Sequence, residues 1–93
     1  MKFEDHCAEC EQKLGRPYPE VHRFLDQFFK MLGPDKHRQE LHHRNGIAMV
    51  RAKWGDDAAK AAELHIRSDF GGYLPEDVTD VILWFRGIVH LPN

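Results

Sequence analysis

Residues 19–32, PEVHRFLDQFFKML, carry the clearest structural signal in the chain. Their apolar side chains recur at the i, i+3, i+4, i+7, i+8 and i+11 positions that share one face of an α-helix, and a proline stands in the favourable first turn. We therefore predict one amphipathic helix over this stretch, stopped by Gly33-Pro34. The apolar stripe of this helix comprises Val21, Phe24, Leu25, Phe28, Phe29 and Leu32.

The chain on both sides of this stretch is also predicted to be helical. Helix-forming residues run from Phe3 to Leu14 and end at Gly15, a common C-cap residue. No alternation of apolar and polar residues is long enough to indicate a strand. The sequence therefore predicts an all-α fold, a compact bundle of four or five helices that forms a single domain over residues 1–93. The predicted helices cover residues 3–14, 19–32, 35–54, 58–70 and 78–89.

Three of these helices have features that refine the prediction. Gly46 lies inside the third helix, where glycine costs about 1 kcal/mol relative to alanine, and this indicates a packing or site requirement. Asp56 or Asp57 is expected to cap the fourth helix, whose four alanines allow close packing. The last helix is so apolar that we expect it to be largely buried. The expected core contains Val21, Phe24, Leu25, Phe28, Leu41, Ala62, Ile66, Ile82 and Phe85.

Composition and charge exclude several classes of protein. With 93 residues, 42% of them hydrophobic and 30% charged, the chain is expected to fold. Its formal net charge of -2 disfavours nucleic-acid binding, which relies on an excess of positive charge. No apolar run approaches the roughly 20 residues of a membrane span, and the start MKFEDHCAEC has acidic residues where a signal peptide has an apolar core. We expect a cytoplasmic protein without membrane contact.

Histidine is the unusual component, with seven in the chain. Two of them begin H-x3-D motifs, His22 with Asp26 and His65 with Asp69. Because residues four apart share one helical face, each motif presents an imidazole beside a carboxylate. Helical bundles build metal sites from such side chains on facing helices. The plainer alternative is a hydrogen bond within each pair.

A third histidine group lies in HRQELHHRNGI, residues 37–47. Adjacent residues on a helix project about 100° apart, so we expect one of His42 and His43 to face inward. Imidazoles and carboxylates together are typical ligands of Zn, Mn and Fe. We therefore predict that the three groups face one shared cavity and bind one of these divalent transition metals, with no catalytic residue assigned. The candidate ligands are His22, Asp26, His42, His43, His65 and Asp69.

The motif CAEC, from Cys7 to Cys10, is a second candidate for zinc. A structural zinc site needs four ligands, and the chain has no second C-x2-C motif, so His6 and a distant histidine would have to complete it. A thioredoxin-like role would require a βαβ context that the predicted helices do not provide. We expect both cysteines to be reduced thiols outside the site.

The motifs H-x3-D, HR-x3-HH-x2-GI and H-x3-D, in this order, resemble those of a family of small bacterial and phage-associated helical proteins of unknown function. The resemblance covers most of the chain. Only Cys7, Cys10 and the segment 56–64 depart from the family's pattern. The resemblance implies a shared fold and a shared polar site, and it implies no particular activity.

A weaker similarity is to the HD metal-dependent phosphohydrolases, which are all-helical enzymes. Their order of His, His-Asp and Asp is similar to His22, His42-His43 and Asp69 here. His43 stands where the HD pattern has aspartate, so the defining dipeptide is missing. This similarity adds little to the case for metal-dependent hydrolysis, because a shared fold does not establish a function.

Two functions from different classes remain open. The first is a metal-binding domain, for which hydrolysis is the candidate reaction, since the ion lowers the pKa of a bound water. In that case Asp26, Arg38 or Glu40 would support the ligands or contact the substrate. The alternative is a non-catalytic interaction module with structural histidines, which binds a protein partner or a second copy. A third role, beside nucleic acid, would use the basic residues of the third helix and is disfavoured by the net charge. The aromatic anchors of an interaction module would be Trp54, Tyr73 and Trp84.

Overall fold

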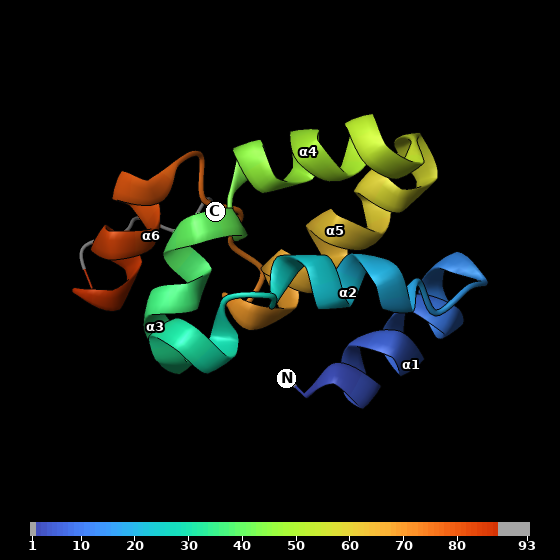
Figure 1. The fold of residues 1–93 in the computed structure, drawn as a ribbon, viewed down its shortest axis with the longest axis horizontal. Coiled ribbons are helices and arrows are strands. Elements are labelled where there is room, and N and C mark those ends of the chain that lie inside the picture. The colour runs from blue at the N-terminus through green and yellow to red at the C-terminus, as the bar shows by residue number, and fades with distance from the viewer. Residues whose placement is uncertain (1, 88–93) are drawn as a thin grey trace.

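Six helices make up the part of the chain that the computed structural model describes, residues 2–87, and this part contains no strand (Figure 1). The all-α prediction is confirmed. Residues 2–87 form six helices rather than the four or five expected because two of the predicted helices are interrupted and the pieces on either side of Gly33-Pro34 form one kinked helix. Ile88 and Val89, assigned to the last predicted helix, lie outside the described residues. In chain order the helices are α1 (Phe3–Leu14), α2 (Pro19–Leu25), α3 (Phe29–Leu41), α4 (Arg44–Trp54), α5 (Asp56–Asp69) and α6 (Val78–Phe85).

Helix α5 lies at the centre and contacts α1, α2 and α4. It runs antiparallel to α4, to which it is joined at Gly55 (Figure 1). The four alanines of α5 are all buried, and their small side chains let the neighbouring helices approach closely. Asp56 and Asp57 lie in the first turn of α5, so the prediction that one of them is the cap is wrong, although their charge still favours the helix N-terminus.

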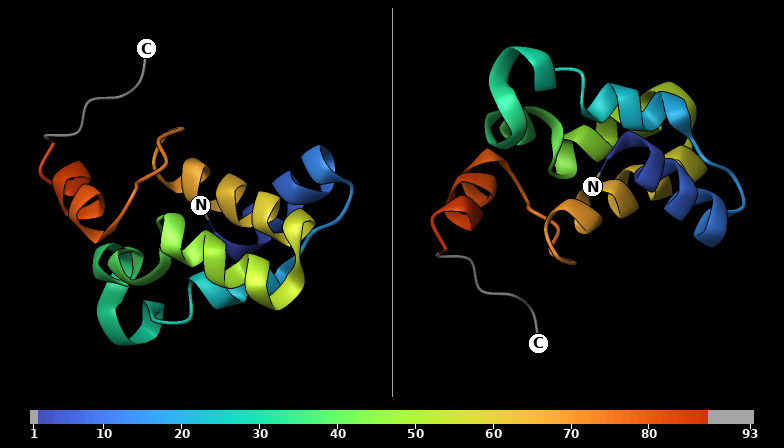
Figure 2. Two further views of the ribbon diagram at one scale, coloured as in Figure 1. Left: turned by 90° about the horizontal axis from the view of Figure 1, so that it is seen from above. Right: turned by 90° about the horizontal axis from the view of Figure 1, so that it is seen from below.

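Helices α3 and α6 lie together at one end of the molecule, with α1 at the other end (Figure 2). Helix α6 packs mainly on α3 and buries only Val81. Val78 and Phe85 remain 43% and 39% exposed, so the prediction of a largely buried last helix is wrong. A helix that packs on one main neighbour has only one of its faces covered. Asp77 caps α6 by accepting a hydrogen bond of 3.0 Å from the backbone N–H of Asp80.

The predicted helix over residues 19–32 is interrupted by a turn between α2 and α3, so the prediction of a single helix is wrong. The side-chain amide of Gln27 donates to the Phe24 carbonyl across 2.8 Å and satisfies a group that the interruption frees. The turn also directs the carboxylate of Asp26 toward the histidines. Periodicity could not reveal the turn because the apolar spacing continues through it unchanged. The predicted stop at Gly33-Pro34 is a kink inside α3, where Gly33 has a φ of 85°.

The predicted helix over residues 35–54 is also interrupted, at His42 and His43. Neither residue is helical, with φ and ψ of -83° and 53° at His42 and of -157° and -175° at His43. The corner places the carbonyl of Leu41 against Gly46, where an added Cβ would overlap that backbone. Gly46 therefore has the packing role that its place in the sequence indicated, because only a residue without a side chain admits the carbonyl.

The buried core runs along α5 and includes Phe70, which is the largest fully buried side chain and was not predicted. Phe24 and Phe28 are only partly buried and pack against the margin of this core. Among the described residues, no helix combines the length and the apolar character that a membrane span requires. The predicted core residues that are buried are Val21, Leu25, Leu41, Ala62 and Ile66; Ile82 is partly buried, and the prediction is wrong for Phe85.

Candidate metal centre

Four side chains from three parts of the chain meet beside α5. His65 and Asp69 lie one turn apart on α5, as the H-x3-D spacing predicts. The corner between α3 and α4 contributes His42, and the turn after α2 contributes Asp26. The side chains of His42 and His65 are fully buried, whereas that of Asp26 is 28% exposed. We call these four residues the Asp–His cluster.

The ligand atoms of the Asp–His cluster surround one point. His42 Nε2 lies 3.2 Å from His65 Nε2 and 3.1 Å from Asp69 Oδ2. Asp26 Oδ1 lies 3.4 Å from His42 Nε2 and 3.3 Å from His65 Nε2. The distance between His65 Nε2 and Asp69 Oδ2 is 3.4 Å. Zinc bonds of about 2.0–2.1 Å hold the ligand atoms of a tetrahedron roughly 3.3–3.4 Å apart, so these five separations are close to the edges of a tetrahedral site. All four ligand atoms lie within 4.8 Å of one another.

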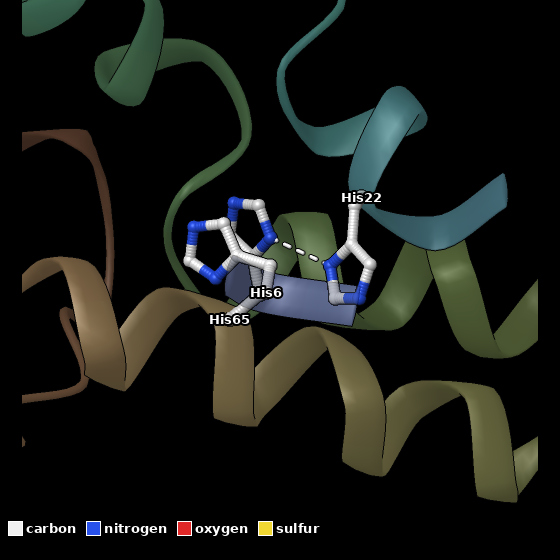
Figure 3. A group of neighbouring side chains, drawn as sticks. All are labelled: His6, His22 and His65. Carbon is white, nitrogen blue, oxygen red and sulfur yellow. Dashed lines mark hydrogen bonds between the residues drawn. The ribbon is translucent and has the colours of Figure 1, made fainter. Parts of the chain in front are cut away.

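His22 sets the position of the proton on His65 (Figure 3). His22 Nε2 lies 2.9 Å from the carbonyl oxygen of Pro17, which can only accept, so this nitrogen carries a proton. Burial, with the neighbouring His6, lowers the pKa of His22, so the ring is neutral at pH 7 and its Nδ1 is an acceptor. His65 Nδ1 donates to it across 2.8 Å. The lone pair of neutral His65 is therefore on Nε2, which faces the cluster.

Two further buried histidines contact the aspartates of the cluster, and neither was among the predicted metal ligands. His6 stacks on His65 with the ring centroids 3.6 Å apart, and its Nε2 lies 3.3 Å from Asp69 Oδ1. His37 Nε2 lies 3.2 Å from Asp26 Oδ1. Neither histidine has a carboxylate four residues later, so the motif search missed both. Their signal in the sequence was the abundance of histidine, since all six histidines in residues 2–87 are buried.

The surroundings of the cluster keep both carboxylates ionised. Burial alone would raise the pKa of Asp26, but the surrounding histidines, with hydrogen bonds from His37 and His42, outweigh it and hold the pKa far below its usual range. Burial would also raise the pKa of Asp69, but hydrogen bonds from two histidines outweigh it and lower the pKa. Burial lowers the pKa of His65 to about 4. Burial would also lower the pKa of His42, but hydrogen bonds to both aspartates raise it. In the metal-free protein, His42 therefore supplies the proton between the two carboxylates.

The metal-free protein is expected to lose stability as the pH falls from 6.5 to 4. In the unfolded chain His22 and His65 take up protons near pH 6.5. The lowered pKa of His65, about 4, keeps this ring neutral in the folded protein over most of this range, and the lowered pKa of His22 acts in the same direction. The unfolded state then binds more protons, and each such group lowers the free energy of unfolding by about 1.4 kcal/mol per pH unit. Urea unfolding at pH 7 and pH 5 measures the difference.

Other titrating groups do not reverse this trend. Because the pKa of His42 is raised in the folded protein, its contribution to the free energy of unfolding is fully present below pH 6.5 and is lost only as the pH rises. The lowered pKa values of Asp26 and Asp69 mean that their stabilisation is present above about pH 3.9 and is lost under more acidic conditions. The variant His22→Gln should show a shallower dependence on pH. Equal stability of the wild-type protein at pH 7 and pH 5 would contradict the prediction.

His43 is the predicted ligand that the structure leaves outside both candidate groups in residues 2–87. Its Nε2 lies 3.1 Å from the carbonyl oxygen of Gln39, one turn back along α3. His22 belongs to a second group with His6 and His65, next to the Asp–His cluster (Figure 3). Both residues of this adjacent pair are buried, so the expectation that only one of them faces inward is wrong, and what distinguishes His42 is that it belongs to the Asp–His cluster.

Cys7 and Cys10 are free thiols and belong to neither group among the described residues. Burial raises the pKa of both, to about 11 for Cys10. Both thiols therefore stay protonated at neutral pH in the metal-free protein.

A cavity of about 650 Å³ adjoins the Asp–His cluster. Asp26 and Asp69 line it, together with His22 and His37, whereas the ligand histidines His42 and His65 do not. The cluster therefore meets the cavity on its carboxylate side.

A protein family described as a domain of unknown function (DUF6915) matches residues 1–85 of the chain. This agrees with the expected resemblance to a family without an assigned activity. No curated protein and no solved structure matches the chain.

Proposed function

The chain belongs to the DUF6915 family, whose description names no activity, and we propose that it binds one divalent transition metal ion at the Asp–His cluster. The observation that carries this proposal is the spacing of the four ligand atoms, because the five separations that involve a histidine are all between 3.1 and 3.4 Å. The ligands are Asp26, His42, His65 and Asp69.

The charges within the cluster support a cation at its centre. Two ionised carboxylates and the Nε2 lone pair of His65 face one another in a largely buried space. Without a metal, one proton on His42 is shared among three acceptors, and a nitrogen can direct that proton at only one of them. A divalent ion interacts with all of them at once and balances the charge of both aspartates.

The neighbouring group of His6, His22 and His65 is a weaker candidate for the metal. The two Nδ1 atoms of His22 and His65 are 2.8 Å apart, which is the distance of a hydrogen bond and is shorter than the edge of a metal tetrahedron. This hydrogen bond instead orients His65, as the partners of ligand histidines usually do. We therefore assign His22 a supporting role.

The donor set narrows the choice of ion and the chemistry that it supplies. Tetrahedral spacing with nitrogen and oxygen donors suits zinc, while manganese and iron accept the same donors. An ion at the carboxylate wall of the cavity would lower the pKa of a bound water, so hydrolysis is the class of reaction that this site favours. Asp26 and Asp69 hold the ion, and His65, oriented by His22, completes the nitrogen side together with His42.

Elemental analysis of protein prepared without a histidine tag tests the proposal. We expect about one equivalent of zinc, manganese or iron per chain. His42→Gln and Asp69→Asn should each reduce the metal content to background, because each removes a ligand. His43→Gln is the matched control, since it removes the adjacent buried histidine from outside the cluster and should leave the metal content unchanged.

Two results would contradict the assignment. A wild-type protein that takes up no metal when zinc, manganese and iron(II) are supplied would exclude the metal-binding function and favour the interaction module. The exposed apolar residues Trp54, Val78 and Phe85 would then be the first candidates for partner contact. Equal loss of metal in His42→Gln and His43→Gln would mean that the ligand set is wrong.

A further inference from the structure

The cavity beside the Asp–His cluster is lined by more basic than acidic side chains. Lys2, Arg23, Lys30 and Arg38 line it, against the acidic Glu4 and the two aspartates of the cluster. The aspartates are the residues assigned to the metal. With a divalent ion bound, the cavity is therefore distinctly positive, although the whole chain has a formal net charge of -2. A positive pocket in an acidic protein concentrates negatively charged ligands.

Arg38 is the basic residue nearest to the metal ligands. Its Nη2 atom lies 3.7 Å from Asp69 Oδ1, and its side chain is only 20% exposed. The Nε–H of Arg38 is buried and has no hydrogen-bond partner among the described residues. An unpaired buried donor costs free energy, so the described residues alone do not satisfy the hydrogen bonds of this guanidinium group, which belongs to a residue that lines the cavity.

We propose that the cavity binds a small organic oxyanion, with one oxygen on the metal ion and another on the guanidinium group of Arg38. This inference rests on the proposed metal site, which places the ion at the wall shared with the cavity. Phosphoryl and carboxylate groups share the required chemistry, because both present several negative oxygens to a guanidinium.

The other walls of the cavity indicate the rest of the ligand. The rings of Phe3 and Phe29 line it, and Phe29 is 49% exposed. The guanidinium carbon of Arg23 lies 5.0 Å from the centre of the Phe3 ring, which places one more positive charge beside an aromatic surface. A ligand with an aromatic or apolar group attached to its oxyanion would contact both the basic and the aromatic side chains of the cavity.

Calorimetric titration of the metal-loaded protein with phenylphosphonate, benzoate and neutral benzamide tests the inference. We expect phenylphosphonate or benzoate to bind and benzamide not to bind. The anion that binds more tightly shows whether the cavity prefers a phosphoryl or a carboxylate group. Arg38→Met keeps most of the apolar length of the side chain and should weaken anion binding by about tenfold or more. Arg51→Met is the matched control, because Arg51 lies on α4, pairs with Asp56 and does not line the cavity.

The metal content of each sample separates this inference from the proposed function. Full metal content without binding of either anion would overturn the oxyanion pocket and leave the metal site intact. Equal anion affinity in Arg38→Met and wild type, or equal binding of benzamide, would also overturn it. A wild-type sample that takes up no metal would instead refute the proposed function itself.

Discussion

Addition of zinc to the metal-free protein is expected to raise its melting temperature strongly at pH 7.5 and very little at pH 5. An ion that binds only the folded state at about 100 times its Kd adds roughly 2.7 kcal/mol to the stability. For a domain of this size, such a gain corresponds to a shift on the order of 10 °C. The ligand imidazoles must be deprotonated to bind the ion, and the raised pKa of His42 makes proton competition effective even in mildly acidic solution.

Variants of neighbouring residues separate the ligand set from general effects on stability. The shift should vanish in His42→Gln and in the double variant His42→Ala with His65→Ala. It should persist in His43→Gln and in the double variant Cys7→Ser with Cys10→Ser. A shift lost only with the cysteines would mean that the wrong ligands were assigned. A melting curve unmoved by zinc, manganese, cobalt or iron(II) in a chelator-treated sample would favour the interaction module.

The substitution Gly46→Ala is expected to destabilise the protein by about 3 kcal/mol or more. In an ordinary helix the same change stabilises by about 1 kcal/mol. Here the new Cβ would overlap the carbonyl of Leu41, which is backbone and cannot rotate away. The corner between α3 and α4 must then open, and this moves His42 out of the Asp–His cluster. Urea unfolding measures the loss of stability, and elemental analysis measures the accompanying loss of metal.

The exposed neighbour of Gly46 provides the control for this substitution. Asn45→Ala changes helix propensity at the adjacent position of α4 without introducing a backbone overlap. We expect this variant to be as stable as the wild-type protein or slightly more stable, with its metal content unchanged. A Gly46→Ala variant that is also more stable than the wild type would show that the close approach of Leu41 has no energetic importance.

Local sequence patterns were sufficient for features that depend on residues within a few turns of one another. The bounds of α1 were predicted correctly, because helix formers run up to Gly15 and the left-handed C-cap conformation suits glycine. The pairing of His65 with Asp69 was also predictable, because four residues make about one helical turn. Gly46 stood out because glycine is costly inside a helix, although its partner could not be named from the sequence.

Long-range packing decided the rest. The turn that brings in Asp26 and the corner that brings in His42 interrupt patterns that locally satisfy an uninterrupted helix. Each break gives up a few helical hydrogen bonds and gains contacts with residues far along the chain. Asp26 and His42 contact each other in this way, and both contact His65.

The amino-acid sequence alone therefore determined that the protein is helical, that its histidines are exceptional and that two of them pair with aspartates on helical faces. Only the tertiary structure determined that His42 rather than His43 enters the cluster and that His6 and His37 surround it. It also determined that the last helix keeps much of its apolar surface exposed. The physical reason is that helical periodicity is a local property of the backbone, whereas the meeting of side chains from α2, α3 and α5 depends on how whole helices pack.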